Sequence, residues 1–302
     1  MRKSPVLLFA AFLVACQPAE EAPEPAAEPA AEPQQEAAPQ PDTLAAILDA
    51  QPDEAKARYQ YRHPKETLEF FGIEPGMTIV EGLSGQGWYS KILVPYLGSE
   101  GKLIGTAYSL EMYPLFSFMN EERLARMQKF VTTFTTGAAE WVGEDGAEVA
   151  AFHMGSMPAE LEGTADAVIF IRALHNLARF ENAGEGPFLT ESLDEVYRVL
   201  KPGGVFGVVQ HHARDVMPDE WADGSKGYLK KQFVIDRVTA AGFEFEDEAD
   251  FNANPKDEPT TDDIVWRLPP SYNTSKDDPE LKAQYEAIGE SNRMTLKFRK
   301  PM

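Results

Sequence analysis

Cysteine and basic residues are scarce in this 302-residue sequence. Cys16 is the single cysteine, so disulfide frameworks, cysteine zinc sites and catalytic thiol pairs are excluded. Any metal would need histidine or carboxylate ligands, and we expect none. Lysine and arginine number 28 against 49 acidic residues, a formal charge of −21. Because a field of that sign repels polyphosphates, nucleic-acid binding and adsorption to anionic membranes are disfavoured.

Apolar runs long enough to span a membrane, roughly 20 residues, are also lacking. Arg2 and Lys3 instead precede a shorter apolar run over 6–14, which is typical of a signal peptide at residues 1–15. The run ends in Leu-Val-Ala-Cys16, which resembles a bacterial lipobox and implies lipidation of Cys16 after cleavage. An ordinary secretory signal with a chance cysteine, or a buried strand, is the alternative interpretation.

Residues 16–42 have a composition that cannot form a core. Positions 17–42 hold seven prolines, seven acidic residues and no lysine or arginine, so we expect a disordered tether. Gln17 after Cys16 resembles the outer-membrane sorting signal of lipoproteins in Gram-negative bacteria. We therefore expect an exported lipoprotein that faces the periplasm, is anchored in the outer membrane and contacts the membrane only through its lipid.

Residues 43–302 alternate between strand-like and helix-like segments. Strands are predicted over 77–80, 102–107, 131–136, 166–172, 205–210, 243–246 and 294–299. Helices are predicted over 53–71, 88–97, 121–130, 190–200 and 227–241. Near-continuous apolar strands between helices indicate an α/β fold with a mainly parallel sheet covered on both faces. We divide this domain into an N-terminal helical segment (53–76), a core (77–210) and a C-terminal part (211–302).

A glycine-rich turn follows the first predicted strand of the core. The segment Glu81-Gly-Leu-Ser-Gly-Gln-Gly87 lies between that strand and the helix that begins at Trp88. Strand, glycine turn and helix in this order are typical of the opening of a nucleotide-type βαβ unit. In such sheets ligands bind beyond the carboxyl ends of the strands, so we expect the binding site there.

This turn, the segment DAVIFIRALHNL and the later segment VLKPGGVFGVV together resemble class I S-adenosylmethionine (SAM) dependent methyltransferases. More narrowly, YRHPKETLEFFGIEPGMTIVEG, GQGWYSKILVPYLG, FVIDRVTAAGF and LKFRKP are similar to a bacterial group of predicted methyltransferases. The resemblance implies a Rossmann-like fold with a seven-stranded sheet. It also implies SAM as cosubstrate, no metal, and a small molecule or an envelope component as methyl acceptor.

The same resemblance implies a set of cofactor-binding residues, namely Glu81, Gly82, Gly85, Gly87, Trp88, Tyr108, Glu111 and His153. Three positions depart from the usual pattern. Leu83 stands where the first glycine is expected, and Ala107 or Tyr108 stands where an acid normally closes the second strand, with Glu111 as a substitute in the following loop. His153 stands where an acid usually follows the third strand. Weak and tight SAM binding therefore both stay open.

His175, Asn176 and His211 are the candidate catalytic residues, because the first two follow the fourth strand and the third ends the fifth. A histidine with its ordinary pKa of about 6.5 can act as a general base. Capping of the next helix is the alternative role for His175, and core packing is the alternative for Trp88. His211 and His212 point to opposite sides of a strand, so they do not indicate a metal site.

Two further classes of function compete with methyl transfer. An exported binding or envelope-assembly lipoprotein that keeps the fold without catalysis is one, and a metal hydrolase is a distant other. We expect 221–227 and 250–290 to cover the strand ends as specificity loops. The sequence leaves the acceptor and the oligomeric state open.

Overall fold

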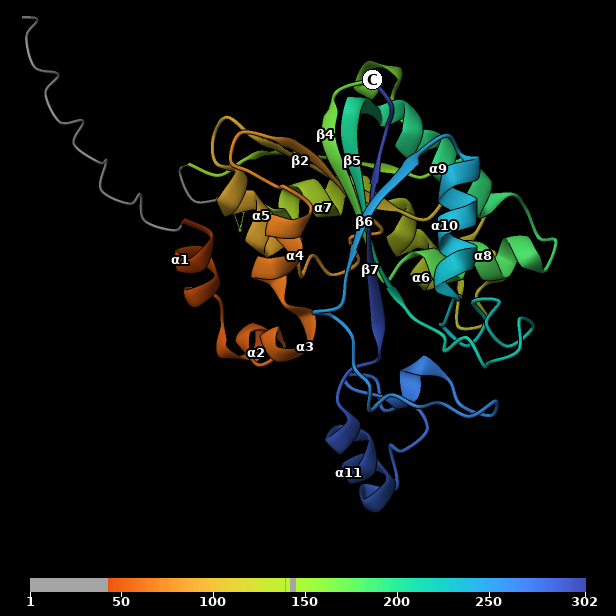
Figure 1. Cartoon of the computed structure of the whole chain (residues 1–302). Helices are drawn as coiled ribbons and strands as arrows, with labels where there is room; N and C mark the ends of the chain where they lie inside the picture. The colour runs from red at the N-terminus through yellow and green to blue at the C-terminus, as the bar shows by residue number, and fades with distance from the viewer. Residues whose placement is uncertain (1–42, 139, 142–144) are drawn as a thin grey trace, which may run out of the picture. The chain divides into compact units, whose positions relative to one another are not determined.

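The computed structural model describes residues 43–302 except 139 and 142–144. The predicted signal peptide, Cys16 and the tether lie outside the described residues. One seven-stranded sheet with the order β3-β2-β1-β4-β5-β7-β6 forms the centre (Figure 1). Its strands are β1 (Thr78–Gly82), β2 (Lys102–Ala107), β3 (Glu148–His153), β4 (Ala165–Ile171), β5 (Leu200–His211), β6 (Glu244–Ala249) and β7 (Arg293–Arg299). The adjacent strands β3, β2, β1, β4 and β5 pair in parallel, and β7 is antiparallel to both of its neighbours.

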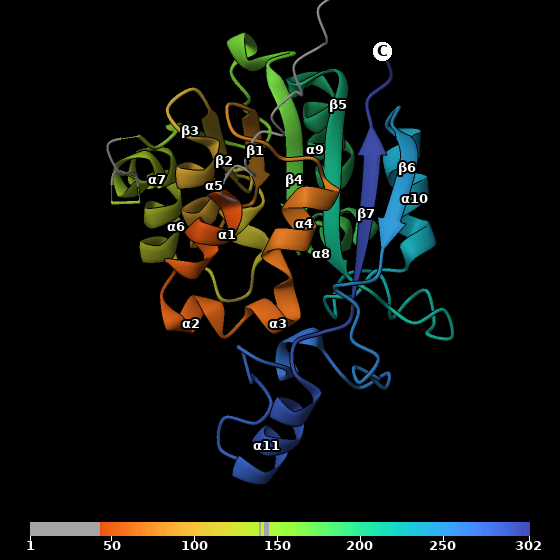
Figure 2. The same ribbon diagram turned by 60° about the vertical axis from the view of Figure 1, so that its left-hand side comes forward.

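Apolar side chains cover both faces of this sheet. Neighbouring residues of a strand point to opposite faces, so Ile79 and Leu103 join one core cluster while Val80 and Ile104 join the other. Helices lie on both sides of the sheet, with α4 and α5 on one side and α9 and α10 on the other (Figures 1 and 2). The prediction of a Rossmann-like fold with a mainly parallel seven-stranded sheet is therefore confirmed.

Helices connect most of the strands. The helices before β3 are α1 (Thr43–Asp49), α2 (Asp53–Lys56), α3 (Tyr59–Arg62), α4 (Pro64–Phe70), α5 (Ser90–Leu97), α6 (Glu121–Gln128) and α7 (Phe130–Ala138). Those after β3 are α8 (Leu174–Asn182), α9 (Phe188–Val199), α10 (Lys231–Ala240) and α11 (Pro279–Ile288). Short 3-10 turns are η1 (Tyr113–Leu115), η2 (Ala159–Leu161) and η3 (Val265–Arg267). None of these helices within the described part of the chain is long and apolar enough to cross a bilayer.

The prediction of a strand over 131–136 is wrong, because this segment belongs to helix α7. Its threonines suggested a strand, since β-branched residues favour extended structure. However, Phe130, Phe134 and Ala138 are four residues apart and buried together on one helical face. The Thr136 hydroxyl donates to the carbonyl of Thr132 at 2.7 Å, which satisfies it within the helix. The third strand instead runs over Glu148–His153.

A substitution at the contact between α7 and the sheet tests this packing. Gly105 of β2 lies directly beneath the Phe134 ring, and an added Cβ would overlap that ring. We expect Gly105→Ala to lower the free energy of unfolding by about 1–3 kcal/mol through overpacking. A Cβ added at Gly137 in the same helix would have no atom within 4 Å. Gly137→Ala should therefore raise the free energy of unfolding by about 0.5–1 kcal/mol. Urea unfolding measures both changes, and a neutral Gly105→Ala would contradict the contact.

Candidate functional site

Two adjoining cavities lie beyond the carboxyl ends of the parallel strands. The larger, of about 820 Å³, adjoins β1, β4 and β5, and residues from 265–271 form one wall. The smaller, of about 600 Å³, adjoins β2, and half of its lining residues are aromatic or methionine. Leu83, Gly85, Gln86, Asn176 and Trp266 line both. The cavities therefore meet at the loop after β1 and the first turn of α8.

The loop after β1 has a backbone conformation that glycine permits. Gly85 and Gly87 have φ angles of 58° and 71°, in the left-handed region that other residues rarely adopt. A Cβ on Gly87 would lie 2.7 Å from the Trp141 ring, whereas a Cβ on Gly85 would have no heavy atom nearer than 3.8 Å. Gly85 therefore presents open backbone to both cavities. Leu83, which replaces the usual glycine, also has a positive φ of 54°, at a cost of about 1–2 kcal/mol.

Glu81 and Gly82 close β1 beneath this loop. Gly82 permits the close approach of β4, because an added Cβ would overlap the Phe170 ring. Glu81 is only 4% exposed, and its Oε2 accepts a hydrogen bond from the Ser90 hydroxyl at the start of α5. Burial raises the pKa of Glu81 to about 8, although this hydrogen bond opposes the shift. The Glu81 carboxyl is therefore largely protonated at neutral pH and links the loop to α5.

His175 and His211 lie side by side in the larger cavity, with ring centroids 5.4 Å apart. Burial lowers the pKa of His175 to about 4, and the charges of Arg172 and Arg179 lower it further against a hydrogen bond from Gln210. The pKa of His211 is also lowered well below its usual value, first by burial and then by nearby cationic groups. Both imidazoles are therefore neutral at pH 7, and each is a weaker base than an exposed histidine.

Tyr108 and Asn176, both predicted site residues, are in direct contact. The Asn176 amide donates to the Tyr108 hydroxyl at 2.9 Å, across the boundary between the two cavities. Burial raises the pKa of Tyr108 to about 12 against the effect of this hydrogen bond. The neutral hydroxyl retains its own proton as a donor. This pair therefore places a hydrogen-bonded polar group in a lobe that is rich in aromatic and methionine side chains.

Not all of the residues predicted for the cofactor line a cavity. Glu81, Gly82, Gly85 and Trp88 line the larger cavity, and Gly85 and Tyr108 line the smaller, whereas Gly87, Glu111 and His153 line neither. Glu111 is exposed in the loop after β2. His153 ends β3, and its ring lies 5.7 Å from that of Phe130, a residue of the smaller cavity. Its Nε2 is buried without a hydrogen-bond partner among the described residues.

A buried carboxylate, Glu290, joins three arginines behind the larger cavity. Arg62 ends α3 and Arg58 directly precedes that helix, whereas Arg293 begins β7. The Arg62 Nε lies 3.1 Å from the Glu290 Oε1. Burial alone would raise the pKa of Glu290, but Arg293 and Arg62, together with Arg172 and Arg58, hold it at about 2. This ionised carboxylate therefore binds the two ends of the domain to each other.

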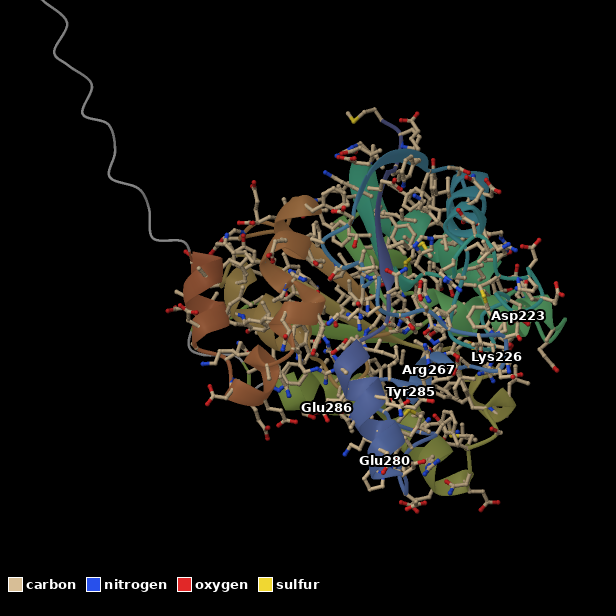
Figure 3. The ribbon with its side chains drawn as sticks, turned by 60° about the horizontal axis from the view of Figure 1, so that its bottom comes forward. Asp223, Lys226, Arg267, Glu280, Tyr285 and Glu286 are labelled. Carbon is tan, nitrogen blue, oxygen red and sulfur yellow. The ribbon has the colours of Figure 1, made fainter. Side chains whose placement is uncertain are left out.

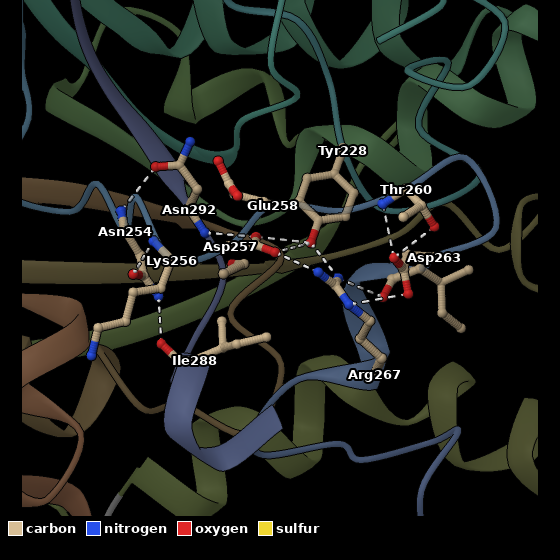
Figure 4. Close-up of polar contacts among 12 residues, drawn as sticks. Tyr228, Asn254, Lys256, Asp257, Glu258, Thr260, Asp263, Arg267, Ile288 and Asn292 are labelled. Carbon is tan, nitrogen blue, oxygen red and sulfur yellow. Dashed lines mark hydrogen bonds and ion pairs between the residues drawn. The ribbon is translucent and has the colours of Figure 1, made fainter. Parts of the chain in front are cut away.

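The wall that contains Trp266 is held by a second buried ion pair (Figure 4). Asp257 accepts a hydrogen bond from the Arg267 guanidinium at 2.7 Å and another from the Tyr228 hydroxyl at 2.9 Å. The backbone N–H of Asn292 donates to the same carboxylate at 2.9 Å. These bonds connect the 250–292 excursion to the segment after β5 and to the start of β7. Trp266 is thereby held 5.7 Å from the His175 ring.

Sequence patterns did not single out Arg172, Arg293 or Trp266 as site residues. Arg172 follows the apolar strand β4 directly and lines the larger cavity. A charge at the carboxyl end of a buried strand is a usable signal, since ligands bind at that edge. Arg293 and Trp266 come from the C-terminal part, where no motif marks them. Within the described residues no group of three His, Cys, Asp or Glu gathers as a metal site.

Comparison with known proteins points to methyltransferases over part of the chain. No family model matches it. Over 95 residues, 28% of its length, the chain is 34% identical to a sterol 24-C-methyltransferase of Debaryomyces hansenii, of which the match covers 24%. The chain therefore spans about a quarter of the length of the curated relative it matches.

Solved structures with weaker likeness cover most of the chain. The 4+2 cyclase SpnF matches with 17% identity, a TM-score of 0.48 and 80% of each chain covered. A SAM-dependent methyltransferase from Aquifex aeolicus matches with 18% identity and a TM-score of 0.44 over 68% of this chain and 92% of its own. Geranyl diphosphate methyltransferase in complex with SAM matches with 15% identity and a TM-score of 0.48 over 85% and 94%. Likeness at this level does not define a reaction.

Removal of the Glu290 charge should destabilise the domain. Glu290→Gln leaves two buried guanidinium groups and a half-buried one without their carboxylate, so we expect the free energy of unfolding to fall by about 3–5 kcal/mol. Urea unfolding at pH 7 measures the loss. Glu286→Gln on the exposed helix α11 (Figure 3) is the control and should change it by less than about 0.5 kcal/mol. Equal effects of the two substitutions would show that Glu290 is not a structural hub.

The contribution of Glu290 should also depend on pH. Its pKa of about 2 in the folded chain lies below the ordinary 4.5, so its stabilising effect is complete above pH 4.5 and disappears as the pH falls towards 2. We expect the stability difference between the natural chain and Glu290→Gln to shrink over that interval, because the amide resembles the protonated carboxyl. Unfolding measured at pH 6, 5, 4 and 3 tests this, and a constant difference would contradict it.

Proposed function

We propose that this protein is a SAM-dependent methyltransferase that acts on a small molecule or an envelope component. The observation that carries the proposal is the open glycine backbone at Gly85, where the larger and the smaller cavity meet. A dinucleotide-type loop in this position approaches a ligand closely, since no side chain intervenes. The partial match to a sterol 24-C-methyltransferase supports the same reaction class.

The two cavities suit the two ends of SAM. The smaller lobe is rich in aromatic and methionine side chains, which suits the adenine base, and the Tyr108 hydroxyl is a polar partner at its edge. The larger lobe is polar and contains Glu81 and Trp88 beside the loop. When bound, SAM supplies a methyl group that its sulfonium charge already activates, so the protein needs mainly to position the acceptor.

His175, His211 and Asn176 are the groups that we propose to contact the acceptor. All three line the larger cavity beside the loop. Because both imidazoles are neutral at pH 7, either can accept a hydrogen bond or a proton from an acceptor hydroxyl or amine. The lowered pKa of His175 makes it a weak base, so we assign these groups first to orientation of the acceptor and only second to proton transfer.

One observation favours the second candidate function, an exported binding protein without catalysis. No Asp or Glu of the described residues lines the smaller cavity, whereas class I methyltransferases usually close the second strand with an acid that binds the ribose hydroxyls. Loss of such a charge-assisted contact costs about 1.5–3 kcal/mol, which lowers the affinity for SAM by about one to two orders of magnitude. SAM affinity therefore separates the two candidates. The predicted export and outer-membrane anchoring would apply to both.

Calorimetric titration of S-adenosylhomocysteine into the full chain tests the proposal. We expect saturable binding, and Gly85→Asp should weaken it at least about tenfold because a carboxylate enters the cavity junction. Gly76→Asp is the matched control, since Gly76 also has a positive φ and open space for an added Cβ but does not line either cavity. Absence of saturable binding at millimolar ligand, or equal loss in both variants, would overturn the proposal.

A further inference from the structure

Arg172 lies in the larger cavity, and its side chain makes no hydrogen bond or ion pair with any described residue. Its backbone N–H donates to the carbonyl of Val209 in β5 at 2.6 Å, which fixes the residue at the strand end. Its φ is 60°, an uncommon angle for a residue other than glycine. The side chain lines the cavity, and its Nε is buried without a hydrogen bond to any described residue. A guanidinium has five N–H donors, and leaving the buried Nε–H of Arg172 without a partner is costly.

The groups nearest to Arg172 do not supply the missing negative charge. Burial lowers the pKa of Arg172 to about 9, and Arg62 and Arg293 lower it further. Glu290 is the carboxylate that opposes this shift, but its oxygens already bind Arg58, Arg62 and Arg293. One carboxylate thus serves several guanidinium groups, and the charge of Arg172 remains available to a ligand.

The cavity as a whole is electropositive, although the protein is strongly acidic. Five cationic side chains line it, those of Arg58, Arg62, Lys91, Arg172 and Arg293. Two carboxyl groups, those of Glu54 and Glu81, also line it, and burial keeps Glu81 largely protonated. The ionised Glu290 behind the cavity offsets one of the five positive charges. The two histidines add no charge at pH 7. In a chain with a formal charge of −21, this concentration of positive charge points to an anionic ligand.

SAM alone does not explain this charge. At neutral pH it carries one carboxylate against an ammonium and a sulfonium, so its net charge is positive. We propose that the methyl acceptor is an anion whose carboxylate or phosphate binds against Arg172, with Arg62 and Arg293 beside it. This inference rests on the proposed function and adds a substrate class to it. Arg172 is then a specificity-determining residue, because planar guanidinium donors match both anions.

The experiment uses inorganic phosphate and acetate as probes of the anion site. The thermal unfolding of the full chain is measured with saturating S-adenosylhomocysteine, with and without each probe, at constant ionic strength. We expect a probe at tenfold excess over its Kd to raise the Tm by about 3 °C. Arg172→Gln should abolish this rise. Lys91→Gln removes one positive charge from the same cavity. This variant should still show the rise in Tm if the anion binds at Arg172.

The stability of Arg172→Gln distinguishes a ligand site from a structural role. Because the guanidinium makes no hydrogen bond or ion pair with the described part of the chain, its replacement should leave the Tm without probe unchanged or higher. A folded variant that no longer responds to either probe supports the inference. A variant that loses several degrees without probe, or natural protein that responds to neither probe, overturns it.

A second arm separates the acceptor from the carboxylate of the cosubstrate itself. If Arg172 bound that carboxylate, Arg172→Gln would weaken binding of S-adenosylhomocysteine but not of 5′-methylthioadenosine, which lacks it, and the inference would be wrong. Equal affinities of S-adenosylhomocysteine for both proteins support an acceptor site. If the natural chain responds to phosphate yet binds no S-adenosylhomocysteine, the proposed function fails, and an anion site without a methyl acceptor replaces this inference.

Discussion

The carboxylate of Glu290 is the interaction on which the shape of the site depends. The carboxyl edge of an open α/β sheet has no wall of its own, so the larger cavity exists only because outlying segments close over it. Arg58 and Arg62 bring in the helices that precede β1, and Arg293 brings in the start of β7. Because these guanidinium groups are shielded from water, their positive charges would repel one another strongly. A single ionised carboxylate reverses that repulsion and joins segments more than 200 residues apart in the sequence.

Desolvation determines the protonation state of three other groups at this edge. The same burial that protonates Glu81 keeps His175 and His211 neutral. The backbone at this edge is also strained, because Leu83 and Arg172 both adopt positive φ angles directly after parallel strands. Residues held in this way are typical of functional sites, where surrounding structure offsets their cost. The result is a set of groups whose orientation is fixed before any ligand arrives.

The sheet could be predicted from sequence because each buried strand is a short apolar run between turn signals, and the loop could be predicted because its glycines follow such a run. The local sequence pattern gave a wrong prediction at 131–136. The threonines there favour a strand, although three apolar residues of this segment and its flanks share a helical face. The sequence pattern gave no indication of the arginines that gather in the larger cavity. Arg58, Arg172 and Arg293 come together only through the fold, which brings the segment before α3 and the strands β4 and β7 to the same edge, and their spacing in the sequence does not indicate this. The role predicted for Glu111 stays a prediction, because this residue is exposed in the loop after β2 and residue type alone does not define the direction of a side chain.

The contrast between an acidic exterior and an electropositive cavity has a kinetic consequence. An anion that approaches from a distance meets repulsion first and attraction only at the opening. Added salt screens charges separated by more than about 8–10 Å but weakens a buried contact much less. Association of an anionic molecule should therefore become faster as ionic strength rises, while its residence time changes little. The protein would favour compact anions that reach Arg172 over large polyanions, whose remaining charge stays within the repelling field.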